Sequence, residues 1–208
     1  MNSKIKICGI TTINDAKLSL ELGTDLLGFN FYPPSPRYIE PKRAAEIIAQ
    51  LPDESQNVGV FVNMAIDELK NLLAICPLDA VQLHGDETDA DCQEAKALGV
   101  DVIKAVRVRQ VDDMGQCDNY NVQAILLDAF CEELYGGSGH AFDWSILQKK
   151  QTHKKIFLAG GITPDNIIDA LAVGTYGIDL CSGVESGPGI KDTAKLKTLF
   201  EKIKSFNG

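Results

Sequence analysis

The sequence predicts an α/β fold, and within that class a single-domain (β/α)8 TIM barrel. Short apolar runs alternate with helix-period segments from end to end, which is typical of parallel strands joined by helical crossovers. Eight runs of each kind can be counted. No linker or low-complexity stretch interrupts them, so residues 1–208 are expected to form one barrel domain.

The predicted strands are short apolar runs with alternating faces. In the first strand, Lys6 and Cys8 share one face, and in the sixth, Leu126 and Asp128 share one. If the intervening isoleucines and leucines meet the helices, these faces line the barrel mouth. In order, the predicted strands cover residues 4–8, 25–31, 57–62, 79–84, 100–106, 122–128, 155–159 and 177–181.

The predicted helices are the amphipathic stretches that follow these strands. Thr11 is suited to cap the first helix, and Thr163 followed by Pro164 marks the start of the seventh. In order, the predicted helices cover residues 12–22, 41–51, 65–75, 88–98, 109–118, 142–150, 164–173 and 191–205.

An open, doubly wound sheet is the competing architecture. Such a sheet usually carries a glycine-rich dinucleotide fingerprint after its first strand. The Cys-Gly-Ile-Thr-Thr segment at 8–12 does not match G-x-G-x-x-G, so the barrel is favoured.

The composition is that of an ordinary globular protein, and no apolar run is long enough to cross a bilayer. The amino terminus lacks the features of a secretory signal, and the six cysteines are scattered without a C-x-x-C pair. We therefore expect a cytoplasmic protein with reduced thiols. The net charge of -9 argues against a nucleic-acid partner, and we also expect no membrane partner. An anionic ligand must be bound by local groups.

Cys8 ends the first predicted strand and Asp128 ends the sixth, at the end of the barrel where functional loops lie. If they face each other across a ligand, a thiolate can remove a proton from one atom while a carboxylic acid gives one to a neighbouring atom. The alternatives are that Cys8 is an inert buried thiol and that Asp128 only caps the following loop. The two residues alone leave these alternatives open.

Two glycine-rich turns follow the seventh and eighth predicted strands. The first contains Gly160 and Gly161, and the second contains Ser182 and Gly183. Exposed backbone N–H groups at these two places form the phosphate site of many barrels, which lets an acidic protein hold a dianion without a basic patch. The alternative is that the glycines only permit tight turns.

A proline-stiffened segment, YPPSPRYI at 32–39, places Arg37 at the predicted rim. There its guanidinium could grip a carboxylate through paired N–H groups, although a solvated surface arginine is the alternative. The GGSG run at 136–139 lies in the long connection after Asp128 and is typical of a mobile flap.

Taken together, these segments resemble the phosphoribosylanthranilate isomerase family of the tryptophan pathway. The resemblance covers almost the whole chain, with the segments in the family's order. The matching segments are K-I-C-G-I-T at 6–11, G-F-x-F-Y-P-x-S-P-R-Y at 28–38, V-G-V-F-V-N at 58–63, V-Q-L-H-G at 81–85, L-L-D at 126–128, Y-G-G-S-G at 135–139, F-D-W at 142–144, L-A-G-G-I at 158–162 and S-G-V-E at 182–185.

The resemblance implies a cofactor-free and metal-free isomerase. Its reaction would be the Amadori rearrangement of N-(5-phosphoribosyl)anthranilate, a phosphosugar, to 1-(2-carboxyphenylamino)-1-deoxyribulose 5-phosphate, the third step of tryptophan synthesis from chorismate. By the same resemblance, Asp128 would be the general acid and Cys8 the general base. Arg37 would hold the anthranilate carboxylate, and the turns at 160–161 and 182–183 would hold the phosphate.

The chain departs from the family pattern at two positions. Cys181 stands where a serine is common, and Ile162 stands where a leucine is frequent. The resemblance gives His84 no clear catalytic duty, so it is expected to be a wall of the pocket. It also leaves open whether other tryptophan-pathway enzymes dock here.

Two rival functions remain. A metal-dependent sugar-phosphate epimerase could use Cys8, His84 and Asp128 as zinc ligands, because thiolate, imidazole and carboxylate together suit that ion. A non-catalytic barrel that binds phosphosugars or scaffolds a pathway complex is the second rival.

Overall fold

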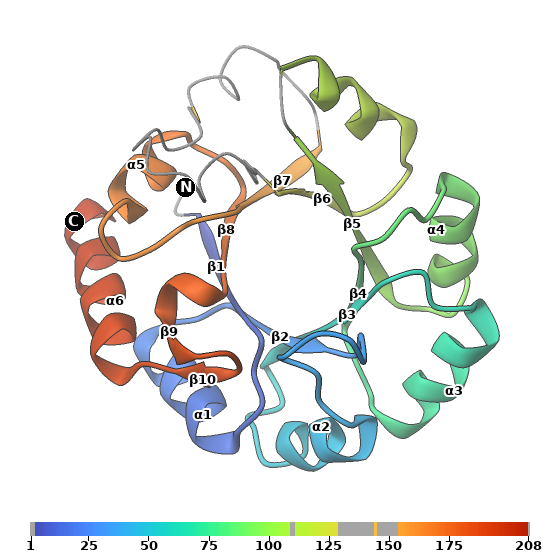
Figure 1. Ribbon diagram of the computed structural model, residues 1–208, viewed down its shortest axis with the longest axis horizontal. Coiled ribbons are helices and arrows are strands. Elements are labelled where there is room, and N and C mark those ends of the chain that lie inside the picture. The colour runs from blue at the N-terminus through green and yellow to red at the C-terminus, as the bar shows by residue number, and fades with distance from the viewer. Residues whose placement is uncertain (1–2, 109–110, 129–143, 145–153, 208) are drawn as a thin grey trace.

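Eight parallel strands form a closed barrel, as the sequence predicts (Figure 1). The strands follow chain order around the wall, and β1 closes the barrel by pairing with β8. In this computed structural model, the described residues are 3–108, 111–128, 144 and 154–207. The strands are β1 (Lys4–Cys8), β2 (Leu26–Asn30), β3 (Gln56–Phe61), β4 (Ala80–Leu83), β5 (Asp101–Arg107), β6 (Ala124–Asp128), β7 (Lys155–Ala159) and β8 (Gly177–Leu180).

Helices surround the barrel and connect its strands (Figure 1). They are α1 (Ile13–Leu22), α2 (Pro41–Ile48), α3 (Ile66–Ile75), α4 (Asp89–Lys96), α5 (Ile167–Ala172) and α6 (Thr193–Asn207). The predicted fifth helix is a 3-10 helix instead, η1 (Val111–Asn119). Its sequence, VDDMGQCDN, is rich in residues with low α-helix propensity. The helix predicted at 142–150 lies outside the described residues, as does the GGSG run at 136–139.

The start of α1 differs by one residue from the prediction. Thr12 is its N-cap, and the side-chain oxygen accepts a hydrogen bond from the N–H of Asp15. The hydroxyl of Thr11 donates instead to the carbonyl of Gly189. Thr11 therefore ties the end of β1 to the connection that follows β8.

The start of α5 is also later than predicted. Thr163 is part of a turn in which its N–H donates to the side-chain oxygen of Asn166, 2.8 Å away. This turn delays the first helical residue to Ile167.

Alternate residues of each strand face opposite sides of the barrel wall. Ile5 and Ile7 belong to the apolar cluster between the strands and the helices, whereas Leu126 belongs to a smaller cluster inside the barrel. The predicted outward placement of the isoleucines is thereby confirmed. It leaves Lys6 and Cys8 facing the interior.

The connection after β8 is more structured than the tight turn that the sequence suggests. It contains the short 3-10 helix η4 (Ser182–Val184) and an antiparallel pair, β9 (Glu185–Gly187) and β10 (Ile190–Lys191). The pair lies beside α1 (Figure 1), and the N–H of Lys191 donates to the side chain of Asp15 on that helix. The hairpin thus returns a lysine to the carboxyl end of β1.

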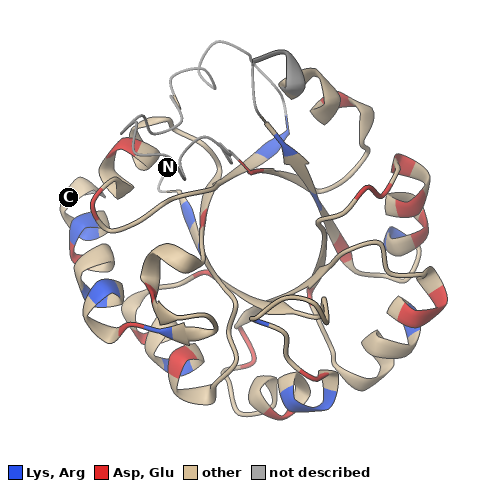
Figure 2. Ribbon diagram, viewed as in Figure 1, with Lys and Arg blue, Asp and Glu red and all other residues tan. Residues whose placement is uncertain are grey.

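Acidic and basic residues are interspersed around the outer ring of helices (Figure 2). Within the described ranges, no helix combines the length and the apolarity that crossing a membrane requires.

Candidate active site

Strands β1 and β6 carry the two predicted acid–base residues to the same end of the barrel. Cys8 is the last residue of β1, and Asp128 is the last residue of β6. Cys8 shares the inward face of Lys6, and Asp128 shares the inward face of Leu126. The structure therefore brings both residues to the mouth, with β7 and β8 between their strands.

A buried ion pair lies one inward position below Cys8. The ammonium of Lys6 is 2.8 Å from the carboxylate of Asp179 on β8, and both side chains are buried. Burial lowers the pKa of Lys6, but the carboxylate of Asp179 and the sulfur of Cys8 outweigh it, so the net pKa is raised. Burial raises the pKa of Asp179 to about 6, although Lys6 opposes this shift. Lys6 is therefore a permanent cation beside the sulfur.

The surroundings of Cys8 stabilise its thiolate. A hydrogen bond from Cys181 holds the pKa of the Cys8 thiol well below its usual range. The ammonium groups of Lys6 and Lys191 act in the same direction and overcome the opposing effect of burial. The same hydrogen bond, together with burial, raises the pKa of the Cys181 thiol. Charged groups, and not only apolar side chains, therefore surround Cys8.

Gly28 on β2 makes room for the sulfur of Cys8. A Cβ atom at this position would lie 2.8 Å from Sγ of Cys8 and 3.1 Å from Nζ of Lys6. Cys8 pairs in register with Gly28, so the absence of a side chain there lets the sulfur and the ammonium occupy the barrel interior.

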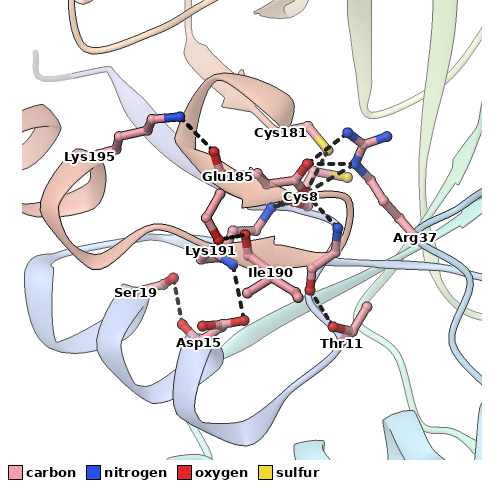
Figure 3. Close-up of polar contacts among 12 residues, drawn as sticks. Cys8, Thr11, Asp15, Ser19, Arg37, Cys181, Glu185, Ile190, Lys191 and Lys195 are labelled. Atoms are coloured by element: carbon pink, nitrogen blue, oxygen red, sulfur yellow. Dashed lines mark hydrogen bonds and ion pairs between the residues drawn. The ribbon is translucent and has the colours of Figure 1, made fainter.

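Arg37 is held at the rim by Glu185. Its Nε lies 3.0 Å from each carboxylate oxygen, and its Nη2 lies 2.7 Å from Oε2. The ammonium of Lys191 lies 2.8 Å from Oε1 of Glu185 and also donates to the carbonyl of Cys8 (Figure 3). Burial raises the pKa of Glu185, but Arg37 and Lys191 outweigh it, so the net pKa is lowered. The alternative of a freely solvated Arg37 is wrong.

Asp128 is engaged by a histidine on the neighbouring side of the mouth. Nε2 of His84 lies 3.4 Å from Oδ2 of Asp128, and Nε2 of Gln82 lies 2.8 Å from Nδ1 of His84. Because the Gln82 amide nitrogen donates, Nδ1 accepts and the ring proton is on Nε2, toward Asp128. The side chain of Asp128 keeps 26% of its surface exposed, so a ligand can reach it.

The two glycine-rich turns touch each other at the mouth. Gly160 and Gly161 have φ angles of 93° and 64°, in the left-handed region that favours glycine. A Cβ on Gly183 would lie 1.9 Å from the carbonyl oxygen of Ile162. The backbone at Ser182 and Gly183 therefore packs directly against the turn after β7.

The zinc site of the rival epimerase does not form from the described side chains. Among these residues, no three His, Cys, Asp or Glu side chains are grouped so that they could hold a metal ion. His84 and Asp128 contact each other, but Cys8 does not join them as a third possible metal ligand.

A cavity of about 980 Å³ opens at the opposite end of the barrel. It is lined by residues at the amino-terminal ends of the strands, among them Lys4, Gln56, Asp101 and Lys155. This face of a TIM barrel generally serves stability, whereas the catalytic loops lie at the carboxyl ends. The cavity is therefore separate from the Cys8 site.

Sequence reasoning missed several charged residues of the site. Asp179 lies two residues before Cys181 in the predicted strand at 177–181, so a period-two reading of that strand could have found it. Glu185 is the last residue of the S-G-V-E segment. That segment was noted in the sequence, but its contact with Arg37 was not predicted. No sequence signal predicts that Lys191 returns to Cys8, because that contact depends on the hairpin.

The fold and the site define the class of this protein as a TIM barrel with titratable side chains at the carboxyl ends of its strands. The chain belongs to the family described as N-(5'phosphoribosyl)anthranilate (PRA) isomerase, whose model matches residues 5–202. The resemblance stated from the sequence motifs is thereby confirmed.

Relatives of known name and structure support this assignment. The N-(5'-phosphoribosyl)anthranilate isomerase of Geotalea uraniireducens is 44% identical over 203 residues, which cover 97% of this chain and 98% of the relative. The crystal structure of phosphoribosyl anthranilate isomerase from Thermotoga maritima is similar with a TM-score of 0.90 and 41% identity, covering 98% of this chain and 99% of that one. A further crystal structure of the isomerase, in complex with reduced 1-(o-carboxyphenylamino)-1-deoxyribulose 5-phosphate, has a TM-score of 0.87 and 39% identity, covering 98% and 99% of the two chains.

Proposed function

We propose that this chain is a single catalytic domain that converts N-(5-phosphoribosyl)anthranilate into 1-(2-carboxyphenylamino)-1-deoxyribulose 5-phosphate. The observation that carries the proposal is the placement of Cys8, between two buried ammonium groups, at the same barrel mouth as Asp128. A thiolate and a carboxylic acid at one mouth suit a reaction that needs a proton removed and a proton delivered. Family membership supplies the substrate.

In the proposed first step, Asp128 gives its proton to the ring oxygen of the sugar. The bond between that oxygen and C1 then breaks, and the nitrogen lone pair forms a protonated imine. Asp128 is suited to this role because its carboxyl group is partly exposed at the mouth and is held by His84.

In the proposed second step, the thiolate of Cys8 removes the proton from C2. The electron pair of the C2–H bond moves toward the cationic imine, which produces an enolamine, and tautomerisation gives the ketone. The protonated imine withdraws electrons strongly, so a base of moderate strength is sufficient. Lys6 and Lys191 keep Cys8 in the basic form before the substrate arrives.

We assign the two anionic ends of the substrate to two different sets of groups at the mouth. Arg37 would bind the anthranilate carboxylate, since Nε and Nη2 are used by Glu185 and Nη1 makes no hydrogen bond with the described residues. The phosphate would bind to backbone N–H groups of the turn at 160–161 and of the turn at 182–183. Their direct packing against each other supports a shared phosphate site.

The proposed function requires no cofactor or metal and places the protein in the cytoplasm, where tryptophan synthesis takes place. Other enzymes of that pathway are the macromolecular partners to test, and nucleic acid and membranes are not expected. The acidic net charge of -9 supports the exclusion of nucleic acid.

The decisive assay follows the fluorescence of freshly prepared phosphoribosylanthranilate in the presence of a metal chelator, with elemental analysis of the same protein. We expect rapid loss of substrate without metal. Turnover that depends on stoichiometric zinc would support the epimerase-like rival. Tight substrate binding without turnover would support the non-catalytic rival.

A further inference from the structure

Cys8 is the last residue of β1, and Cys181 is the first residue after β8, the strand that pairs with β1. The parallel register of β1 and β8 pairs Lys6 with Asp179 and Ile7 with Leu180, and Cys8 and Cys181 are the residues that directly follow this last pair. Neighbouring strands lie about 4.8 Å apart, which is within the Cα separation of about 4.4–6.8 Å that a disulfide requires. The pair of Ile7 and Leu180 therefore brings the two cysteines next to each other on adjacent backbones.

The two side chains also lie together. The Cys181 thiol hydrogen-bonds to Cys8, and Figure 3 draws the two sulfur atoms beside the guanidinium of Arg37. The other contact of this thiol, to Oε1 of Glu185, is long at 3.9 Å. The two thiols therefore lie together beside the charged groups of Arg37 and Glu185.

We propose that Cys8 and Cys181 form a reversible disulfide when the protein meets a hydroperoxide. The thiolate of Cys8 attacks one oxygen of the peroxide, the O–O bond breaks, and a sulfenic acid and hydroxide (or alkoxide) are formed. Cys181 then attacks the sulfur of this sulfenic acid, and its thiol proton leaves with the hydroxyl group as water. The peroxide is reduced, and the two thiols are oxidised to one disulfide.

Cys8 is the thiol of this pair that reacts first. Lys6 and Lys191 stabilise its thiolate, which is the form that attacks peroxides, and it lies at the open end of the barrel. Burial raises the pKa of Cys76 and of Cys92 to about 11, so these thiols stay protonated and react slowly.

Oxidation of Cys8 also removes one of the groups that raise the pKa of Cys181. The hydrogen bond to Cys8 and burial raise the pKa of Cys181, and the negative charge of Cys8 contributes, whereas Lys191 and Arg37 oppose the shift. A sulfenic acid at Cys8 no longer carries the thiolate charge. The two cations then favour the thiolate of Cys181, which is the nucleophile that the second step needs.

The disulfide would protect the proposed base while it stops turnover. A sulfenic acid that finds no thiol is oxidised further to sulfinic acid, which simple dithiols do not reverse. Cys181 captures Cys8 before this stage, and a dithiol can then restore both thiols.

The test treats the full-length protein, its Cys181→Ala variant and a Cys131→Ala control with hydrogen peroxide, followed by dithiothreitol. Cys131 lies outside the described residues, and its variant excludes it as the second thiol. Peptide mapping under non-reducing conditions identifies the linked cysteines without relying on turnover, so it stands even if the proposed isomerase function fails. Isomerase activity is measured in parallel, each variant against its own untreated rate.

We expect the native chain and Cys131→Ala to lose nearly all activity, to contain a Cys8–Cys181 link and to recover with dithiothreitol. Cys181→Ala should also lose activity, but it should gain two oxygen atoms at Cys8 and stay inactive. A link between other cysteines, or equal recovery with and without Cys181, would overturn the proposal.

Discussion

The ammonium of Lys6 lies 2.8 Å from the carboxylate of Asp179, one inward position below Cys8. The pair fills the barrel interior with charge where most barrels place branched apolar side chains. Burial of this ion pair costs desolvation energy. In return, the pair places a fixed cation beside the sulfur of Cys8. The first prediction separates the catalytic contribution of Lys6 from its structural one.

Lys6→Met should damage both stability and reactivity. It leaves Asp179 buried without its cation, so the free energy of unfolding should fall by about 3–5 kcal/mol. It also removes one of the positive charges that lower the pKa of Cys8. Denaturant titration measures the first effect, and the pH dependence of alkylation by iodoacetamide measures the second.

The double variant Lys6→Met/Asp179→Val is the matched control. Replacement of both charges by apolar groups should restore most of the stability, because no buried charge is left unpaired. The alkylation profile of Cys8 should remain shifted to higher pH. If the profile returned to that of the native chain, Lys6 would act only through folding.

Cys181→Ala should move the pH dependence of kcat/KM to higher pH. In the native chain the pKa of Cys8 is lowered, so its thiolate is fully formed above that lowered pKa, and kcat/KM is expected to stay flat above it. Loss of the hydrogen bond from Cys181 raises this pKa, so kcat/KM should decline as the pH falls through the new value. Cys181→Ser keeps a donor and should preserve the flat profile. Identical profiles for both variants would show that the bond does not tune Cys8.

Glu185→Gln should release Arg37 and leave the buried Lys191 without its carboxylate. We expect a loss of about 3–5 kcal/mol in unfolding free energy and a rise in KM larger than the fall in kcat. An effect on kcat alone would contradict the positioning of Arg37 by Glu185.

The same variant has a defined pH signature. The pKa of Glu185 is lowered from its ordinary value of 4.5, so its stabilising effect is complete above that value and is lost as the pH falls through the lowered pKa. The native chain should therefore lose more stability on acidification than Glu185→Gln does, as measured by denaturant titration below pH 4.5.

Gly28→Ala should displace the sulfur of Cys8. The new Cβ would lie 2.8 Å from Sγ, which is closer than van der Waals contact allows. We expect a cost of about 1–3 kcal/mol in stability and a lower kcat. Gly187→Ala is the control, because a Cβ there meets nothing within 4 Å. Equal kinetics for the two variants would argue against the tight fit at β2.

The fold could be read from the sequence because each strand carries its own signal. The alternation of Lys4 to Cys8 predicts which side chains face inward, and β1 obeys it. The 3-10 helix η1 and the hairpin after β8 were not predicted, because glycine and aspartate in these segments fit turns as well as helices.

The site was predictable only where residues lie at strand ends. Cys8 and Asp128 follow from that rule, since the carboxyl ends of parallel strands meet at one mouth. The contacts that Cys8 makes with its charged neighbours could not be predicted from the sequence. Lys191 is 183 residues from Cys8 in sequence and reaches it only through the folded hairpin.

The central claim is that Cys8 and Asp128 act on one substrate as base and acid. Its most direct test measures kcat for Cys8→Ala and Asp128→Asn, together with the affinity of each variant for the reduced product analogue. We expect kcat to fall by about 10²–10⁴-fold in each variant while the affinity changes little. Turnover close to that of the native chain in either variant would contradict it.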